Sequence, residues 1–218
     1  MKYYIYVSDS KVDMLLSQMP RDAKRKIATE FKIDLKLLGA SRKAETEYEE
    51  NRFTRLDAVV SFVRQYGNLG TIDKPDEYIE DTLPMRWVHY PYEADKELPV
   101  VYFGGSTDRT IVGLGGSEKH LIGITPQATV SSHSFAPTLV ACLEEELKLN
   151  LGLNPYALGE EAWRYAVFWT TTHMKGLKQR YEFMAKRLLY GSDEFSDGAA
   201  GHERKILLAT PLYIAMAD

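Results

Sequence analysis

The first third of the chain consists of one apolar run followed by three amphipathic segments. Residues 3–7 are aromatic and β-branched, which is typical of a β-strand. After them, apolar residues recur every three or four positions, which predicts helices. These helices cover residues 10–19, 21–38 and 53–66. Ser10 followed by Asp13 predicts a capping box at the first of them, and the polar residues 40–51 predict a loop or a helix end.

The middle third changes to short apolar or alternating runs separated by Gly, Pro, Asp and Ser. This pattern is typical of antiparallel strands joined in a meander. The runs cover residues 85–90, 100–103, 110–114 and 121–124.

The last third predicts two more helices and a closing strand. The helices cover residues 134–149 and 160–173. The second is apolar around most of its circumference, which predicts that it is buried at the centre of the fold or in a subunit interface. Residues 181–190 fit a helix or a strand, and we favour a helix. Residues 205–216 predict one strand, broken or kinked at Thr210-Pro211, whose end pairs with the first strand of the chain.

These elements predict an α+β fold, a mixed α/β arrangement with a central, mostly antiparallel sheet, flanking helices and one buried helix. A length of 218 residues favours one domain, residues 1–218. Residues 191–202 are rich in Gly, Ser and Asp and predict a mobile loop within that domain.

Charge and composition exclude several classes of protein. The 27 Lys and Arg residues are outnumbered by 31 Asp and Glu residues, which argues against a duplex nucleic-acid binder. Cys142 is the only cysteine, so no internal disulfide forms and a cytoplasmic location is expected. The longest stretch without charged residues, 121–143, contains two prolines and several polar residues, so we expect no membrane span.

Sequence motifs for metals, cofactors and covalent catalysis are absent. The five histidines never stand four residues apart, and no His-Glu-x-x-His string occurs, so we expect no metal and no cofactor. The chain has no Walker A string and no Gly-x-Ser-x-Gly string. Cys142 lies on an apolar helix face, where a thiol is inert.

A short repeat is the most distinctive feature of the middle third. Gly104-Gly105-Ser106 is repeated eleven residues later by Gly115-Gly116-Ser117. Glycine lets backbone N–H groups approach an anion closely, so these segments predict a phosphate-binding wall. The alternative is that they form two tight turns of the meander.

Polar clusters add candidates for the same pocket. Lys119 and His120 follow the second repeat and supply an ammonium and an imidazole to an anion. Residues 8–11 stand at a strand-to-helix turn, where ligands bind in many sheets, and His133 precedes a predicted helix N-terminus. The candidate ligand-binding residues are Ser8, Asp9, Lys11, Gly104, Gly105, Ser106, Gly115, Gly116, Ser117, Lys119, His120 and His133.

Several phrases of the sequence together resemble one bacterial family, known only as a domain of unknown function. They are the opening Ser8-Asp9-Ser10-Lys11 turn, Tyr102 to Gly105, Gly113 to Ser117 with His120, Glu182 to Leu189, and Thr210 to Tyr213. The resemblance covers nearly the whole chain. It implies a single intact domain, and it implies no activity.

Three functions remain open on the sequence. The first is a sensor or partner subunit that binds a small anionic molecule such as a nucleotide. The second is a phosphoester or nucleotide hydrolase with His120 or His133 as acid or base and Asp9 as its carboxylate. The third is an interaction module whose helix 160–173 contacts a partner protein or a second copy of the chain in a homo-oligomer.

Overall fold

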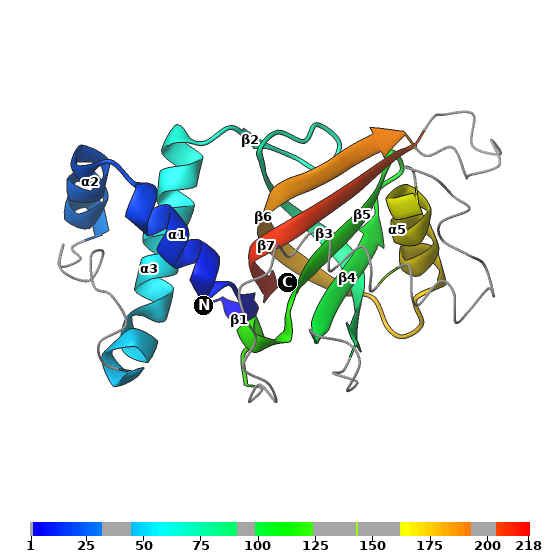
Figure 1. Ribbon diagram of the computed structural model, residues 1–218, viewed down its shortest axis with the longest axis horizontal. Helices are drawn as coiled ribbons and strands as arrows, with labels where there is room; N and C mark the ends of the chain where they lie inside the picture. The colour runs from blue at the N-terminus through cyan, green and yellow to red at the C-terminus, as the bar shows by residue number, and fades with distance from the viewer. Residues whose placement is uncertain (1, 32–44, 91–98, 124–142, 144–161, 193–203) are drawn as a thin grey trace.

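The computed structural model describes residues 2–31, 45–90, 99–123, 143, 162–192 and 204–218 (Figure 1). The first half of the described chain contains β1 (Tyr3–Val7), α1 (Asp9–Gln18), α2 (Arg21–Phe31), α3 (Glu45–Tyr66), β2 (Leu69–Gly70) and β3 (Tyr78–Tyr90). The second half contains β4 (Val100–Ser106), β5 (Thr110–Ser117), η1 (Glu118–His120), α5 (Ala162–His173), β6 (Gln179–Ser192) and β7 (Lys205–Met216). The α+β fold class is therefore confirmed.

Five of the strands close into a barrel. β3 pairs with β4, β4 with β5, β5 with β7, β7 with β6, and β6 pairs back with β3. All of these pairs are antiparallel except β5 with β7, so the sheet is mostly antiparallel. Closure leaves no free edge among these five strands over their paired lengths.

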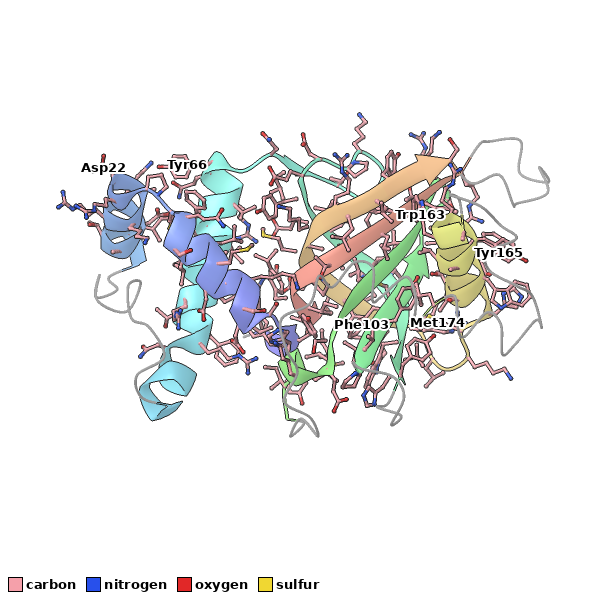
Figure 2. All side chains as sticks on the ribbon, viewed as in Figure 1. Asp22, Tyr66, Phe103, Trp163, Tyr165 and Met174 are labelled. Carbon is pink, nitrogen blue, oxygen red and sulfur yellow. The ribbon has the colours of Figure 1, made fainter. Side chains whose placement is uncertain are left out.

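Alternation along the strands fills the barrel with apolar side chains. Phe103, Phe183 and Tyr181 are buried in the same interior cluster, where the ring of Phe103 meets the ring of Tyr181 edge to face. Figure 2 shows Phe103 among the barrel strands and Trp163 on α5, outside them. Because successive strand residues point to opposite faces, the neighbours of these residues form two outer clusters.

Helices cover two outer faces of the barrel. α1, α2 and α3 pack on one face, where Leu16, Ile27 and Leu56 meet Leu212 and Tyr213 of β7. α5 packs on the other side, against β4 and β5 (Figure 1). α5 therefore packs on the outside of the barrel and does not lie at the centre of the fold. This helix buries Ala162, Ala166, Val167, Thr170 and Thr171, while its tryptophans are half-buried.

β7 runs unbroken through the predicted break at Thr210-Pro211. Its first half pairs with β5 and its end pairs antiparallel with β1, which confirms the predicted pairing of the two ends of the chain. The pairing with β6 shifts by one residue between Met184 and Ala185. Such a bulge accommodates a proline, which cannot donate a ladder hydrogen bond.

Three secondary-structure predictions are wrong. Residues 181–190 form a strand and not a helix, because Tyr181 and Phe183 point into the barrel while Met184 packs outside it, and burial on both faces hides the alternation. α3 begins at Glu45, eight residues before the predicted start at residue 53 and within the polar segment predicted as a loop or a helix end. The expected strand at 121–124 is reduced to a single bridge between Leu121 and Tyr6.

Some predictions fall outside the described residues. These are the helix at 134–149 apart from Leu143, the end of the helix at 21–38, and residues 193–203 of the predicted mobile loop. Residues 191 and 192 belong to the end of β6. The single domain over residues 1–218 stays a prediction.

Candidate functional site

Two of the predicted polar clusters meet where β1 ends. The segment after β5 returns along β1, because the Ile122 N–H donates to the Ile5 carbonyl at 2.8 Å and Leu121 bridges Tyr6. This return brings the short helix η1, with Lys119 and His120, beside the strand-to-helix turn formed by residues 8–11. We call residues 8–11, 119 and 120 the turn site.

The start of α1 shapes the turn site. Ser8 is the N-cap residue, and its carbonyl accepts hydrogen bonds from the N–H groups of Lys11 at 3.1 Å and Val12 at 3.0 Å. The predicted capping box is therefore wrong, since Ser10 lies within the first turn and Asp13 pairs with Arg55 of α3. The hydroxyl of Ser10 is turned toward His120.

His120 is the buried centre of the site. Its side chain is 5% exposed, and its ring lies edge to face with the ring of Tyr6, 5.7 Å between centroids. The Nε2 atom lies 3.1 Å from the Ser10 hydroxyl oxygen. The Nδ1 atom lies 3.9 Å from a carboxylate oxygen of Asp9 and has no hydrogen-bond partner among the described residues.

Arg52 of α3 belongs to the site and was missed by the sequence analysis. Its Nε donates to Asp9 at 2.9 Å, and its Nη2 donates to the carbonyl of Val7 at 3.0 Å. Both contacts are part-buried. The guanidinium therefore fixes the Asp9 carboxylate and ties α3 to the end of β1. No sequence motif marks this role, because Arg52 stands 43 residues from Asp9.

The lysines make the site electropositive. The Lys11 ammonium donates to the Ser8 hydroxyl at 3.2 Å. Burial, together with the nearby charge of Lys119, lowers the pKa of Lys11 to about 8. Burial also lowers the pKa of His120 below its ordinary value, against the opposing effect of Asp9. His120 is therefore neutral at pH 7, with one ring nitrogen able to accept a proton.

We expect the variant Arg52→Met to raise the pKa of His120 toward its ordinary value. The reason is that the Asp9 carboxylate, no longer neutralised by the guanidinium, stabilises the imidazolium more strongly. NMR titration of the His120 ring protons measures this change. Arg64→Met is the matched control, because Arg64 lies on the same helix and binds Glu80. An unchanged pKa in Arg52→Met contradicts the assigned contact.

The glycine repeats do not form turns, and both predicted turns are wrong. Gly104 and Gly105 lie inside β4, and Gly115 and Gly116 lie inside β5. β4 and β5 pair with each other along these glycines, and Gly104, Gly105 and Gly116 leave room for neighbouring side chains. A Cβ atom added at Gly116 would stand 2.2 Å from the Tyr6 hydroxyl oxygen.

The rest of the predicted pocket is not brought together. Ser106 pairs with Ile111 next to the β4–β5 turn, whereas Ser117 pairs with Val100 at the other end of the hairpin. The Gly104 to Ser106 segment is therefore not part of the turn site. His133 lies outside the described residues. The structure brings together Ser8, Asp9, Lys11, Lys119 and His120.

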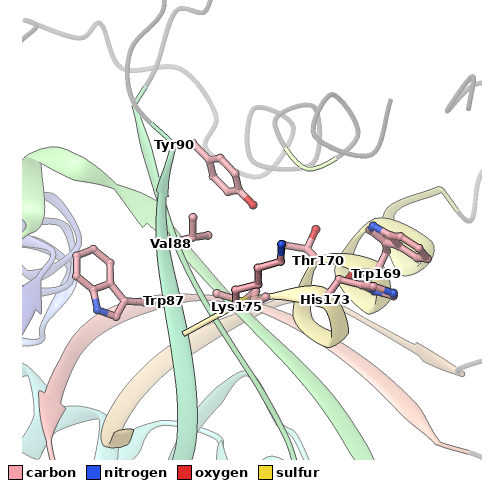
Figure 3. A pocket seen from close by; sticks show the side chains of 8 residues that line it. Trp87, Val88, Tyr90, Trp169, Thr170, His173 and Lys175 are labelled. Carbon is pink, nitrogen blue, oxygen red and sulfur yellow. The ribbon is translucent and has the colours of Figure 1, made fainter. Parts of the chain in front are cut away.

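A pocket lies on the side of the barrel that α5 covers. Its volume is about 500 Å³, and it is lined from β3 and α5 by residues that include Val88, Tyr90, Thr170, His173 and Lys175. Figure 3 shows the side chains of Tyr90, Thr170 and Lys175 among those that line this pocket. None of the described residues that line it is a candidate ligand-binding residue. The docking of a partner on this helix stays a prediction.

The described part of the chain shows neither a metal-binding cluster nor a membrane-spanning helix. Among residues with a described position, no group of three or more His, Cys, Asp or Glu is arranged to hold a metal ion. Within the same residues, no helix is both long enough and apolar enough to cross a bilayer.

Comparisons with known proteins give one result for the whole chain. No curated protein and no solved structure matches the sequence. The model of one protein family, described as Family of unknown function (DUF7019), matches residues 2–218. The chain therefore belongs to this family of unknown function.

Proposed function

We propose that this protein binds a small anionic ligand at the turn site, in the manner of a sensor or a partner subunit. The observation that carries the proposal is the clustering of Lys11 and Lys119 at the N-terminus of α1. Arg52 already neutralises the carboxylate of the turn site, Asp9. A ligand with negative charge relieves the repulsion between the two ammonium groups.

The helix N-terminus and the buried imidazole support the same ligand class. The first N–H groups of a helix have no intrahelical acceptor, and the positive end of the helix dipole favours an anion. His120 is 96% buried, since its exposed fraction is 4%, and its Nδ1 lacks a hydrogen-bond partner within the described structure. Phosphate groups carry the charge and the acceptor oxygens that match this set of donors, so a nucleotide is a candidate ligand.

Isothermal titration with inorganic pyrophosphate and with AMP tests the proposal. We expect binding at pH 7 that weakens about tenfold or more in Lys119→Ala, because one charge-assisted contact with the anion is lost. Lys178→Ala is the matched control, since Lys178 is an exposed lysine before β6, and it should bind like the wild type. Absence of binding at millimolar concentration of both probes contradicts the proposal.

Hydrolysis of the bound ligand is the second candidate function. It is favoured by one observation: His120 approaches a hydroxyl with one ring nitrogen and a carboxylate with the other. The same two groups, His120 and Asp9, are those that the sequence analysis assigned to a hydrolase.

A further inference from the structure

In the turn site, the ring of His120 lies between the side chains of Ser10 and Asp9. The hydroxyl oxygen of Ser10 lies 3.1 Å from His120 Nε2, and on the opposite side of the ring Nδ1 lies 3.9 Å from Asp9 Oδ2. A hydroxyl, an imidazole and a carboxylate in this order are the parts of an activated serine nucleophile. A tightening of about 1 Å completes the second contact, and such contacts are often long in unliganded sites.

The burial of His120 is an independent observation that points the same way. The residue is 4% exposed, and its Nδ1 has no partner in the described part of the chain. A buried polar atom without a hydrogen bond costs free energy, so a structural histidine would have its partner in place. Donation from Nδ1 to Asp9 removes this cost and leaves Nε2 as the acceptor for the Ser10 proton.

A substrate can reach the side chain of Ser10. Its side chain is exposed, whereas the base behind it is buried. It lies in the first turn of α1, where the helix dipole stabilises developing negative charge. Arg52 holds the other oxygen of Asp9 at 2.9 Å, which limits the rotation of the carboxylate.

We propose that Ser10 is the nucleophile of an ester hydrolase, with His120 as its general base and Asp9 as the carboxylate that orients His120. The substrate class is a carboxylic ester that also carries an anionic group. That group binds Lys11 and Lys119, so the choice of substrate rests on the proposed function, while the roles of Ser10, His120 and Asp9 do not.

The reaction has two balanced steps. Ser10 Oγ attacks the carbonyl carbon as its proton moves to His120 Nε2, and the bond to the alcohol oxygen breaks as that oxygen takes the proton from His120. The acyl group is then bonded to Ser10. In the second step water attacks the same carbon, His120 accepts a proton from water and returns one to Ser10, and a carboxylic acid leaves. Water is the only co-reactant, and no electrons are exchanged.

Labelling with a fluorophosphonate tests the nucleophile directly. The probe forms an Oγ–phosphorus bond and releases fluoride, so we expect one adduct, mapped to Ser10 by peptide mass spectrometry. The adduct should be absent in Ser10→Ala. In His120→Gln, the rate of adduct formation should fall by about 100-fold or more. Ser17→Ala is the matched control, since Ser17 is an exposed serine of the same helix whose hydroxyl donates to the Met14 carbonyl, and it should label like the wild type.

Hydrolysis of two 4-nitrophenyl esters tests the substrate class. Mono(4-nitrophenyl) succinate should be cleaved faster than 4-nitrophenyl acetate, and Lys119→Ala should slow cleavage of the succinate ester and reduce this preference, whereas Lys178→Ala should leave both rates unchanged. Wild-type protein that binds pyrophosphate but gains no adduct at Ser10 overturns the nucleophile and leaves the anion site intact. An adduct at Ser10 without pyrophosphate binding supports the nucleophile and overturns the proposed function.

Discussion

Lys11→Met should make the folded protein more stable at pH 7 and at the same time abolish most of its affinity for pyrophosphate. Burial and the charge of Lys119 lower the pKa of Lys11 from 10.5 to about 8. The folded protein therefore holds an ammonium group in surroundings that disfavour the charge. Sites that bind charged ligands often carry such a cost in stability.

The sign of the pH dependence follows from the direction of this shift. Between pH 8 and 10.5 the unfolded chain binds more protons at Lys11 than the folded chain, so the stability of the wild type rises with pH in this window. Below pH 8 both states are protonated and the penalty is complete. The stabilisation by Lys11→Met should thus be largest below pH 8 and disappear near pH 10.5.

The size of the effect is limited by the contacts that Lys11 makes. A shift of one pKa unit corresponds to about 1.4 kcal/mol, so the full shift sets an upper bound of roughly 3 kcal/mol. Loss of the hydrogen bond to Ser8 reduces the gain to about 1–2 kcal/mol. Urea unfolding at pH 7 and pH 10 measures the difference, and Lys178→Met is the exposed control.

Anion affinity supplies the second measurement on the same residue. Wild-type affinity for pyrophosphate should fall as pH rises through about 8, because the Lys11 ammonium loses its proton. Lys11→Met should bind at least about tenfold more weakly at pH 7 and lose this pH dependence. A variant that is less stable than the wild type at pH 7, with unchanged affinity, contradicts both the assigned surroundings of Lys11 and its role.

Gly116→Ala should destabilise the protein by about 2–4 kcal/mol, because the new methyl group has no space. It would stand 2.2 Å from the hydroxyl oxygen of Tyr6 and 2.5 Å from the ring carbon that bears it. Tyr6 is fully buried in the barrel interior and cannot turn toward solvent. Movement of its ring also disturbs His120, whose ring lies edge to face with it.

A double-mutant cycle separates this collision from a general cost of losing glycine in a strand. Gly116→Ala should cost less in a Tyr6→Leu background, where the colliding ring is absent. Gly191→Ala is the matched control, since it is also in a strand and its new methyl group would meet the flexible side chain of Arg164 at 3.1 Å. Equal melting temperatures for the two alanine variants contradict the packing described at Gly116.

Much of the fold was readable from local patterns. The strand at 3–7, the helices near 10–19 and 160–173, and the pairing of the two chain ends are confirmed. The helix at 10–19 has one buried face, so its periodicity is visible in the sequence, and the strand at 3–7 is marked by its aromatic and β-branched residues. The strand at 181–190 was missed because both of its faces are buried, one inside the barrel and one under the helices.

The sequence also named most members of the turn site, although as two separate clusters. Residues 8–11 stood out as polar residues at a strand-to-helix turn, and Lys119 and His120 as an ammonium and an imidazole shortly after a glycine pair. Arg52 could not be found in this way, because its partner lies 43 residues away and arginine on a helix surface is ordinary. Nothing in the sequence singled out Ser10 as anything more than a capping residue.

By itself, then, the sequence determined the α+β class, the positions of several helices and strands, and the cluster of polar side chains after the first strand. Only the tertiary structure decided that the sheet closes into a barrel, that Gly116 makes room for Tyr6 and that Gly113 makes room for Tyr102. It also decided that His120 lies between Ser10 and Asp9. The physical reason is that periodicity reports the surroundings of each segment, whereas closure and side-chain contacts depend on partners more than one hundred residues apart.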